Sequence, residues 1–212
     1  MLEPELLLLD EPFSALDPAT REDLLRDFQG ILRETAITAV FVTHDRHEAF
    51  ALANRVGVLN QGYLLQLGSR ENVFLRPETE SVAEIVGIEN RLAGVVETSD
   101  GDYVTIKISD GRVHAKGRFS ARDEGRRLYS PGRGFSQSRT LRSERFKPTH
   151  RESHRRIARY DSPPNKLDCS GFSLIALVDR KESFDLNLSA RDEMTAVFSP
   201  AAVHIIDDKK DR

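Results

Sequence analysis

The chain has 212 residues, enough for one or two domains, and apolar residues make up 39% of it. Its formal net charge of -3 at pH 7 excludes bulk electrostatic attraction to nucleic acid. One cysteine excludes an internal disulfide, and no apolar run approaches the ~20 residues that a membrane-spanning helix needs. We therefore expect a protein of a reducing compartment that reaches a membrane only through a partner.

A run of leucines near the N-terminus is followed at once by carboxylates. Leu6 to Leu9 predict a strand buried on both faces, as in a parallel sheet, and Pro12 ends it. Ligands of open α/β sheets bind beyond the carboxyl ends of the strands, where Asp10 and Glu11 are expected. One of these acids could bind a divalent cation, and the other could orient or deprotonate a water molecule. Two solvated acids in a turn are the alternative.

A helix follows this turn. Asp17 and Pro18 are typical of a helix start, because an acid accepts hydrogen bonds at the N-cap and proline fits the first turn. Apolar residues then recur at helical spacing to about residue 34. We expect this helix to cover one face of the sheet by burying Leu24, Phe28 and Ile31.

Residues 37–43 predict a second buried strand, parallel to the first through a right-handed crossover. His44 follows that strand and is therefore expected on the same sheet edge as Glu11, where a histidine can contact phosphate. Asp45 and Glu48 match a capping box that opens the next helix, and His47 is expected to be exposed. A hairpin with its turn at residues 60–62 and two short helices, 69–75 and 80–86, complete this part.

The string LLLLDEPFSALD resembles the Walker B motif and D-loop of ABC-transporter ATPases, and VTHD resembles their switch-histidine motif. This resemblance implies ATP and Mg²⁺ as cofactors, with Asp10 supporting the metal, through water, and Glu11 as the general base. It implies that His44 contacts the γ-phosphate and holds the attacking water. Ser14 to Asp17 match the D-loop, which crosses the dimer interface, so Ser14 and Asp17 join Asp10 as nucleotide-site residues.

Residues 1–90 resemble the end of an ATPase domain from a binding-protein-dependent importer, but three motifs that lie before the Walker B motif in that family are missing. The sequence has no GxxxxGK[ST] phosphate loop, no LSGGQ-type signature and no Q-loop. We interpret Met1 as an internal start or the edge of a fragment truncated at the N-terminus. We expect the 212-residue chain alone to lack ATPase activity.

The pattern becomes β-rich from Arg91. Residues 91–124, with Asp-Gly turns at 100–101 and 110–111, resemble the first strands of the small barrel appended to such ATPases. Residues 155–206 resemble the molybdate/tungstate-binding, TOBE-like module, and 207–212 form a charged tail. Ser183 matches a serine of that module's oxyanion-binding turn, whereas Asp179 replaces the usual threonine and would repel an oxyanion. A barrel that serves dimer contact alone is the alternative.

The arginine- and serine-rich segment 125–154 lacks apolar periodicity. It is interpretable as a basic arm for nucleic acid or a membrane surface, as a solvated linker, or as the product of a compensated frameshift. Codon degeneracy allows residues 125–133 to encode, one nucleotide over, the Val-Val-Val-Tyr-Ile-Arg-Pro-Glu run that the family resemblance implies here. We favour this hypothesis, which the gene's nucleotides test, and expect residues 126–153 to be the least ordered segment.

The resemblance implies an α/β fold: the C-terminal part of a RecA-like P-loop NTPase (ABC) domain, then a partly disrupted OB-like β-barrel. The implied function is an ATP-hydrolysing importer subunit for an oxyanion such as molybdate, tungstate or sulfate. Its implied partners are transmembrane permease subunits, a second ATPase subunit and, indirectly, a periplasmic or extracellular solute-binding protein, but no nucleic acid. The implied location is the cytoplasmic face of the cell membrane. A non-hydrolysing remnant that senses an oxyanion or dimerises is the alternative, and RNA binding through the arginine-rich segment ranks third.

Overall fold

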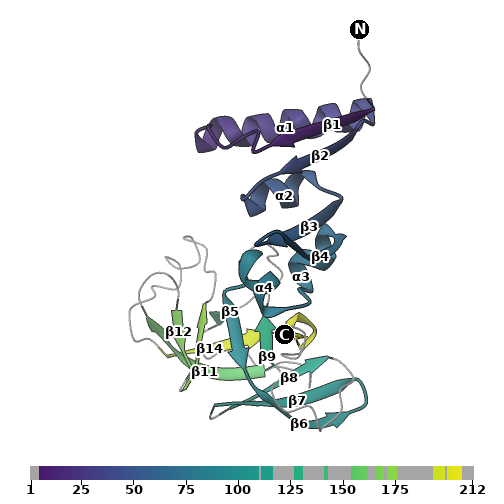
Figure 1. The fold of residues 1–212 in the computed structure, drawn as a ribbon. Helices are drawn as coiled ribbons and strands as arrows, with labels where there is room; N and C mark the ends of the chain where they lie inside the picture. Colours follow the sequence, from purple (N-terminus) through teal and green to yellow (C-terminus); the bar gives the residue numbers. More distant parts are fainter. Residues whose placement is uncertain are drawn as a thin grey trace. The chain divides into compact units, whose positions relative to one another are not determined.

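The computed structural model describes residues 5–109, 111–116, 127–130, 141–142, 154–161, 166–169, 171–175, 193–198 and 200–206. The chain forms two compact units, Met1–Val73 and Phe74–Arg212 (Figure 1). The sequence predicts a boundary at residue 90, whereas the structure assigns helix α4 (Glu80–Ile85) to the second unit. The physical reason is a buried apolar cluster in which Ala83 and Ile88 pack with Ile206.

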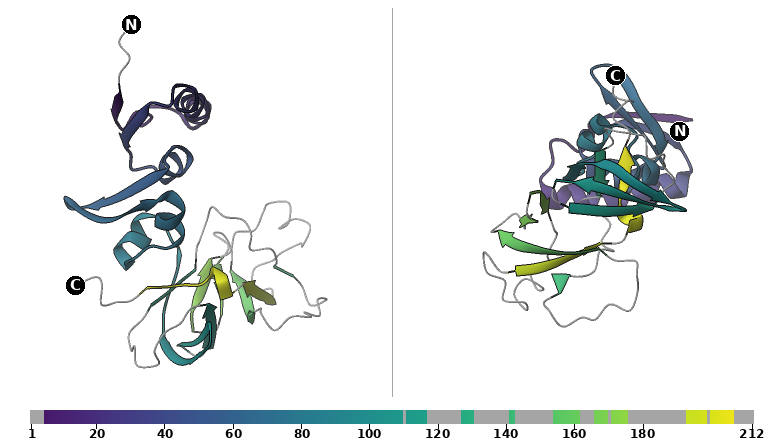
Figure 2. Two further views of the ribbon diagram at one scale, coloured as in Figure 1. Left: turned by 90° about the vertical axis from the view of Figure 1, so that its right-hand side faces the viewer. Right: turned by 90° about the horizontal axis from the view of Figure 1, so that it is seen from below.

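The first unit begins with a strand, a helix and a second strand: β1 (Leu6–Asp10), α1 (Pro18–Thr35) and β2 (Thr38–Val42). The strands are parallel and in register from Leu6 opposite Thr38 to Asp10 opposite Val42. This confirms the predicted crossover unit. Ala36, whose φ of 53° is left-handed, caps the C-terminus of helix α1, and the helix lies along one side of the strand pair (Figure 2, left).

The prediction that these strands are buried on both faces is wrong. On one face the side chains are half-buried, whereas the other face exposes Leu6 (48%), Leu8 (68%), Val40 (53%) and Val42 (58%). Within the described part of this unit, helix α1 covers one side of the pair and nothing is seen to cover the other (Figure 2, left). A run of leucines thus produces a strand whose alternate side chains differ in burial.

Helix α1 is also less buried than predicted. None of its residues is buried, and Leu24 and Ile31 are 41% and 53% exposed. Phe28 is half-buried and packs edge to face on the buried Phe13, with ring centroids 5.9 Å apart. Two strands ~4.8 Å apart make a strip narrower than a helix of ~10 Å diameter, so one strand pair leaves the helix flanks uncovered.

The first unit continues with α2 (Arg46–Leu52), β3 (Arg55–Asn60) and β4 (Tyr63–Ser69). The boundary between the units falls within the short helix α3 (Arg70–Leu75). Strands β3 and β4 form the predicted antiparallel hairpin, with Asn60 opposite Tyr63. Its two turn residues, Gln61 and Gly62, have φ values of 48° and 82°, as a two-residue turn with two left-handed positions requires. The helices predicted over 69–75 and 80–86 are confirmed within one residue.

The second unit consists mainly of strands. They are β5 (Asn90–Ala93), β6 (Val95–Asp100), β7 (Tyr103–Ile108), β8 (Gly111–Lys116), β9 (Arg127–Ser130), β10 (Leu141–Arg142), β11 (His154–Asp161), β12 (Lys166–Asp168), β13 (Ser173–Ile175), β14 (Glu193–Phe198) and β15 (His204–Ile206). They form sheets in the orders β6-β7-β8, β15-β9-β5 and β10-β14-β11-β12-β13. The first predicted Asp-Gly turn is present, with Gly101 at a φ of 59°, whereas Gly111 already belongs to β8.

The core of this unit lies on the β6-β7-β8 sheet. Its buried residues are Val96, Val104, Ile106, Ile108, Val113, Ala115 and Val203. They alternate along β7 and β8, because successive side chains of a strand point to opposite faces. A short 3₁₀ helix, Pro200–Ala202, leads into β15, and His204 there hydrogen-bonds through Nε2 to the carbonyl of Pro77 at 2.9 Å.

Two stretches of the segment predicted to be disordered, β9 and β10, are strands, so the prediction is wrong for them. Strand β9 pairs with β5 on one side and β15 on the other. Backbone hydrogen bonds to two neighbours order it, and the composition of the segment does not reveal them. The rest of residues 125–153, Asp179, Ser183 and the tail 207–212 lie outside the described residues.

Candidate active site

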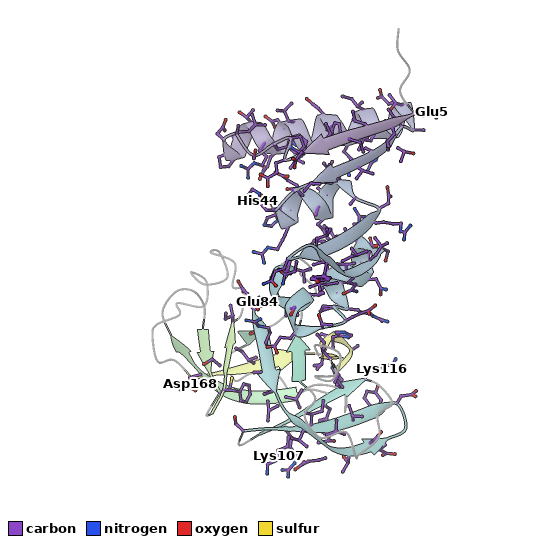
Figure 3. All side chains as sticks on the ribbon, in the orientation of Figure 1. Glu5, His44, Glu84, Lys107, Lys116 and Asp168 are labelled. Carbon is purple, nitrogen blue, oxygen red and sulfur yellow. The ribbon has the colours of Figure 1, made fainter. Side chains whose placement is uncertain are left out.

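The carboxyl ends of β1 and β2 bring an acid and a histidine together. Glu11 directly follows β1, and its backbone N–H donates to the carbonyl of Val42, the last residue of β2, at 2.8 Å. His44 lies two residues beyond Val42, with Nδ1 2.9 Å from Oε1 of Glu11 although 33 residues separate them. Figure 3 labels His44 beside α2. The predicted shared edge for Glu11 and His44 is therefore confirmed.

The Glu11 carboxylate determines the protonation of this pair. An ionised carboxylate only accepts hydrogen bonds, so the proton in this contact is carried by Nδ1 of His44. The hydrogen bond to Glu11, its negative charge and the charges of Glu48 and Asp45 together raise the pKa of His44 above its ordinary value. Both side chains remain accessible, with His44 75% and Glu11 42% exposed. The pair is thus open to a ligand.

We expect Glu11→Gln to lower the pKa of His44, because glutamine removes the charged partner and keeps the side-chain size. The raised pKa means that the pair stabilises the fold fully below about pH 6.5, the unfolded value, and that this is lost as the pH rises through the raised pKa. A histidine-ring NMR titration of the 212-residue chain measures the shift, with His44→Gln assigning the signal. An unchanged pKa would show that the contact is absent in solution.

The turn after β1 holds Glu11 in an uncommon conformation. Its φ is 43°, the left-handed region that residues other than glycine rarely adopt. The carbonyl of Glu11 accepts hydrogen bonds from the backbone N–H of Ser14 at 3.2 Å and from its hydroxyl at 3.0 Å. The Ser14 side chain therefore closes the turn that presents the Glu11 carboxylate.

Asp17 caps helix α1. Its Oδ1 accepts from the backbone N–H groups of Ala19 and Thr20, both at 3.1 Å. Hydrogen bonds led by the one from the Thr20 side chain hold the pKa of Asp17 below its ordinary value. Among the described contacts, the Ser14 side chain reaches only the backbone carbonyl of Glu11, and the Asp17 side chain reaches only the start of α1. The predicted nucleotide contacts of both residues stay predictions.

Asp10 ends β1 with its side chain exposed. Among the described residues, no three His, Cys, Asp or Glu side chains gather closely enough to hold a metal ion. Mg²⁺ typically takes one or two carboxylates and completes its shell with waters and substrate phosphates. The donors present fit a Mg²⁺ that arrives with a nucleotide, held in part by Asp10, and they do not form a metal site by themselves.

The predicted capping box is half right. Asp45 accepts from the N–H of His47 at 2.7 Å, and His47 is exposed, as predicted. Glu48, however, accepts from the Thr43 hydroxyl instead of returning to the backbone of Asp45. It is 3% exposed and lies near Arg21, so sequence reasoning missed a buried polar group beside the site. Its signal in the sequence is an acid that directly precedes the apolar helix stretch Ala49–Leu52.

The first unit has an α/β fold with parallel strands, a crossover helix and polar side chains at the strand ends. No family model matches the chain. Comparison with curated proteins shows that the chain is homologous to the ATP-binding subunits of ABC importers.

Three of these relatives differ in the solute that their names give. The molybdate/tungstate import ATP-binding protein WtpC of Pyrococcus horikoshii is 30% identical over 211 residues, 97% of this chain and 57% of the relative. The sulfate/thiosulfate import ATP-binding protein CysA of Xylella fastidiosa is 50% identical over 108 residues, 51% of this chain and 31% of the relative. The spermidine/putrescine import ATP-binding protein PotA of Pseudomonas aeruginosa is 42% identical over 119 residues, which are 56% of this chain and 33% of the relative.

The chain spans between 31% and 57% of the length of these relatives. Among solved structures, the cytoplasmic molybdate-binding protein ModG with molybdate bound is similar at a TM-score of 0.41 and 11% identity, covering 56% of this chain and 96% of that protein. Within the described residues, no helix is both long and apolar enough to cross a bilayer.

Proposed function

We propose that this chain carries the water-activating part of the ATPase site of an ABC importer subunit. The observation that supports it best is the 2.9 Å contact between Nδ1 of His44 and Oε1 of Glu11 at the ends of two parallel strands. A carboxylate oriented by a second side chain and open to solvent is suited to accept a proton from water.

Each residue has a proposed role. Glu11 accepts the proton of the water that attacks the γ-phosphorus while the bond to the ADP oxygen breaks. His44 orients Glu11 through Nδ1–H, and Nε2, protonated in the imidazolium that Glu11 favours, donates to phosphate oxygen. Asp10 helps to hold the Mg²⁺, which neutralises charge on the phosphates when bound. Ser14 and Asp17 present a loop to the nucleotide and to a second ATPase subunit.

The partners and solute belong to the same proposal. The subunit works on the cytoplasmic face of the membrane, bound to transmembrane permease subunits that receive solute from a binding protein. The relative that aligns with 97% of this chain is named for molybdate and tungstate, and a second relative is named for sulfate and thiosulfate, which supports molybdate, tungstate or sulfate as the solute. Ser183 is the proposed oxyanion contact in the second unit. The alternative is a non-hydrolysing remnant that senses an oxyanion or dimerises.

We expect the 212-residue chain by itself to neither hydrolyse ATP nor bind it, because its sequence has no phosphate loop to hold the β- and γ-phosphates. Isothermal calorimetry with Mg²⁺-ATP and a phosphate-release assay test this. Micromolar binding would contradict the expectation.

A chimera then tests whether the site is competent. The part of the Xylella fastidiosa relative that precedes its match to Leu6 is placed before Leu6, so that it supplies the missing nucleotide-binding motifs. Mg²⁺-dependent ATP hydrolysis by the folded chimera is expected under the proposed function. A folded chimera that binds ATP and does not turn it over would favour the non-hydrolysing alternative.

A further inference from the structure

Arg21, in the second turn of α1, connects two segments that flank the Glu11–His44 pair. Its Nη2 donates to the carbonyl of Leu16 at 3.1 Å, and its Nη1 donates to Oδ2 of Asp45 at 3.2 Å. Its Nε lies 3.8 Å from Oε1 of Glu48, an ion pair without a hydrogen bond. Leu16 ends the loop that starts at Glu11, whereas Asp45 directly follows His44. One guanidinium thus joins both segments.

The segment around His44 is fixed on both sides of the histidine. Before it, the hydroxyl of Thr43 donates to Oε2 of Glu48 and accepts from the backbone N–H of Asp45 at 3.0 Å. After it, Asp45 is bound to Arg21 and caps α2. His44 itself is 75% exposed, and within the described residues its side chain hydrogen-bonds to Glu11. Its orientation therefore depends on these two neighbours.

The buried carboxylate of Glu48 explains why an arginine is needed at position 21. Its side chain is 3% exposed, so an unpaired charge there would be costly. The Thr43 hydroxyl satisfies one oxygen, and Arg21 provides the nearby positive charge for the other. A planar guanidinium with five donors reaches a carbonyl and two carboxylates at once, which the single ammonium of lysine cannot do.

We propose that Arg21 is a positioning residue, which acts through Glu48 and Asp45 to hold His44 within hydrogen-bonding distance of Glu11. This inference deepens the proposed function and rests on it for its catalytic meaning, because the pair that Arg21 positions is the one assigned to water activation. The alternative is that Arg21 only fastens α1 to α2.

The test is the pKa of His44 in Arg21→Gln, measured by NMR in the 212-residue chain. The charged groups that act on His44 are Glu11, Glu48 and Asp45, and all of them raise its pKa. Removing the Arg21 charge leaves Glu48 and Asp45 less compensated, so direct electrostatics would raise the His44 pKa further. Loss of the Glu11 contact lowers it, because that hydrogen bond is the largest cause of the shift. The two explanations thus predict opposite signs.

We expect the His44 pKa in Arg21→Gln to fall by at least half of the fall measured for Glu11→Gln. Arg21→Lys keeps the charge and is expected to show a fall of the same sign, which covers the case that Arg21→Gln fails to fold. Arg26→Gln is the matched control, because Arg26 lies on the same helix, pairs with the exposed Asp23 and donates to the backbone carbonyl of Glu22. An unchanged or raised His44 pKa in a folded Arg21 variant would overturn the proposal.

This readout is independent of ATP turnover. If Glu11→Gln leaves turnover intact in the chimera while both Arg21 variants lower the His44 pKa, the proposed function fails and the positioning role stands. If Glu11→Gln abolishes turnover while the Arg21 variants leave the His44 pKa unchanged, the positioning role fails alone.

Discussion

Replacing Glu11 by glutamine in the hydrolysing chimera is expected to lower kcat by ~10²–10⁴-fold, the usual contribution of a general base. The amide keeps the length of the side chain and an oxygen that can accept from Nδ1 of His44, so the turn and the histidine stay in place. What is lost is the group that takes the proton of water. KM for ATP is expected to change little, because the effect falls on the transition state.

Steady-state kinetics with phosphate release measure the effect. Glu22→Gln is the matched control, since Glu22 is an exposed glutamate on α1, and its kcat should equal that of the parent chimera. His44→Ala should also reduce kcat severely, because it removes the hydrogen bond that orients Glu11. Near-parental turnover in Glu11→Gln would show that Glu11 is not the general base.

Gly94→Ala is expected to destabilise the second unit by ~1–3 kcal/mol or more, as overpacking of a well-filled core does. A Cβ at Gly94 would lie 2.7 Å from Cγ2 of Ile106, 2.8 Å from Cγ2 of Ile108 and 2.8 Å from the backbone oxygen of Lys107. Both isoleucines are 1% exposed and belong to the buried core, so neither side chain has room to move. The backbone oxygen is held in β7.

The sole cysteine of the chain reports on this loss of stability. Cys169 is 1% exposed and its N–H donates to the carbonyl of Phe172, whose ring packs on the same core. If labelling of Cys169 by a thiol reagent requires opening of the unit, Gly94→Ala should speed it roughly 5- to 150-fold, since every ~1.4 kcal/mol is a factor of ten.

The control variant is Gly30→Ala. Gly30 lies inside α1 with no atom within 4 Å of an added Cβ, so alanine should stabilise that helix by ~0.5–1 kcal/mol and leave Cys169 labelling unchanged. Equal labelling rates in Gly94→Ala and the parent chain would mean that Ile106 and Ile108 do not pack closely against Gly94.

The sequence by itself determined the order of elements in the first unit and the place of the acid–histidine pair. Asp17 and Pro18 mark the start of α1, and the two left-handed residues between Asn60 and Tyr63 form the turn of the hairpin. Both features could be predicted because they depend on residues that are neighbours in the sequence. Two strands joined through a helix run parallel, and parallel strands end at the same edge of the sheet, so Glu11 and His44 had to meet there once both strands were recognised.

Only the tertiary structure decided which apolar residues are covered and which polar groups are paired. Leu8 and Ile31 follow buried-strand and buried-helix patterns and are exposed, because burial depends on what packs against an element. Glu48 fits a local capping pattern, yet its carboxylate bonds to Thr43 and faces Arg21, 27 residues away in sequence. Strand β9 lacks an apolar pattern and is ordered by its neighbours. Contacts between distant segments carry no local sequence signal, which is why the residues that hold His44 in place emerge only from the folded chain.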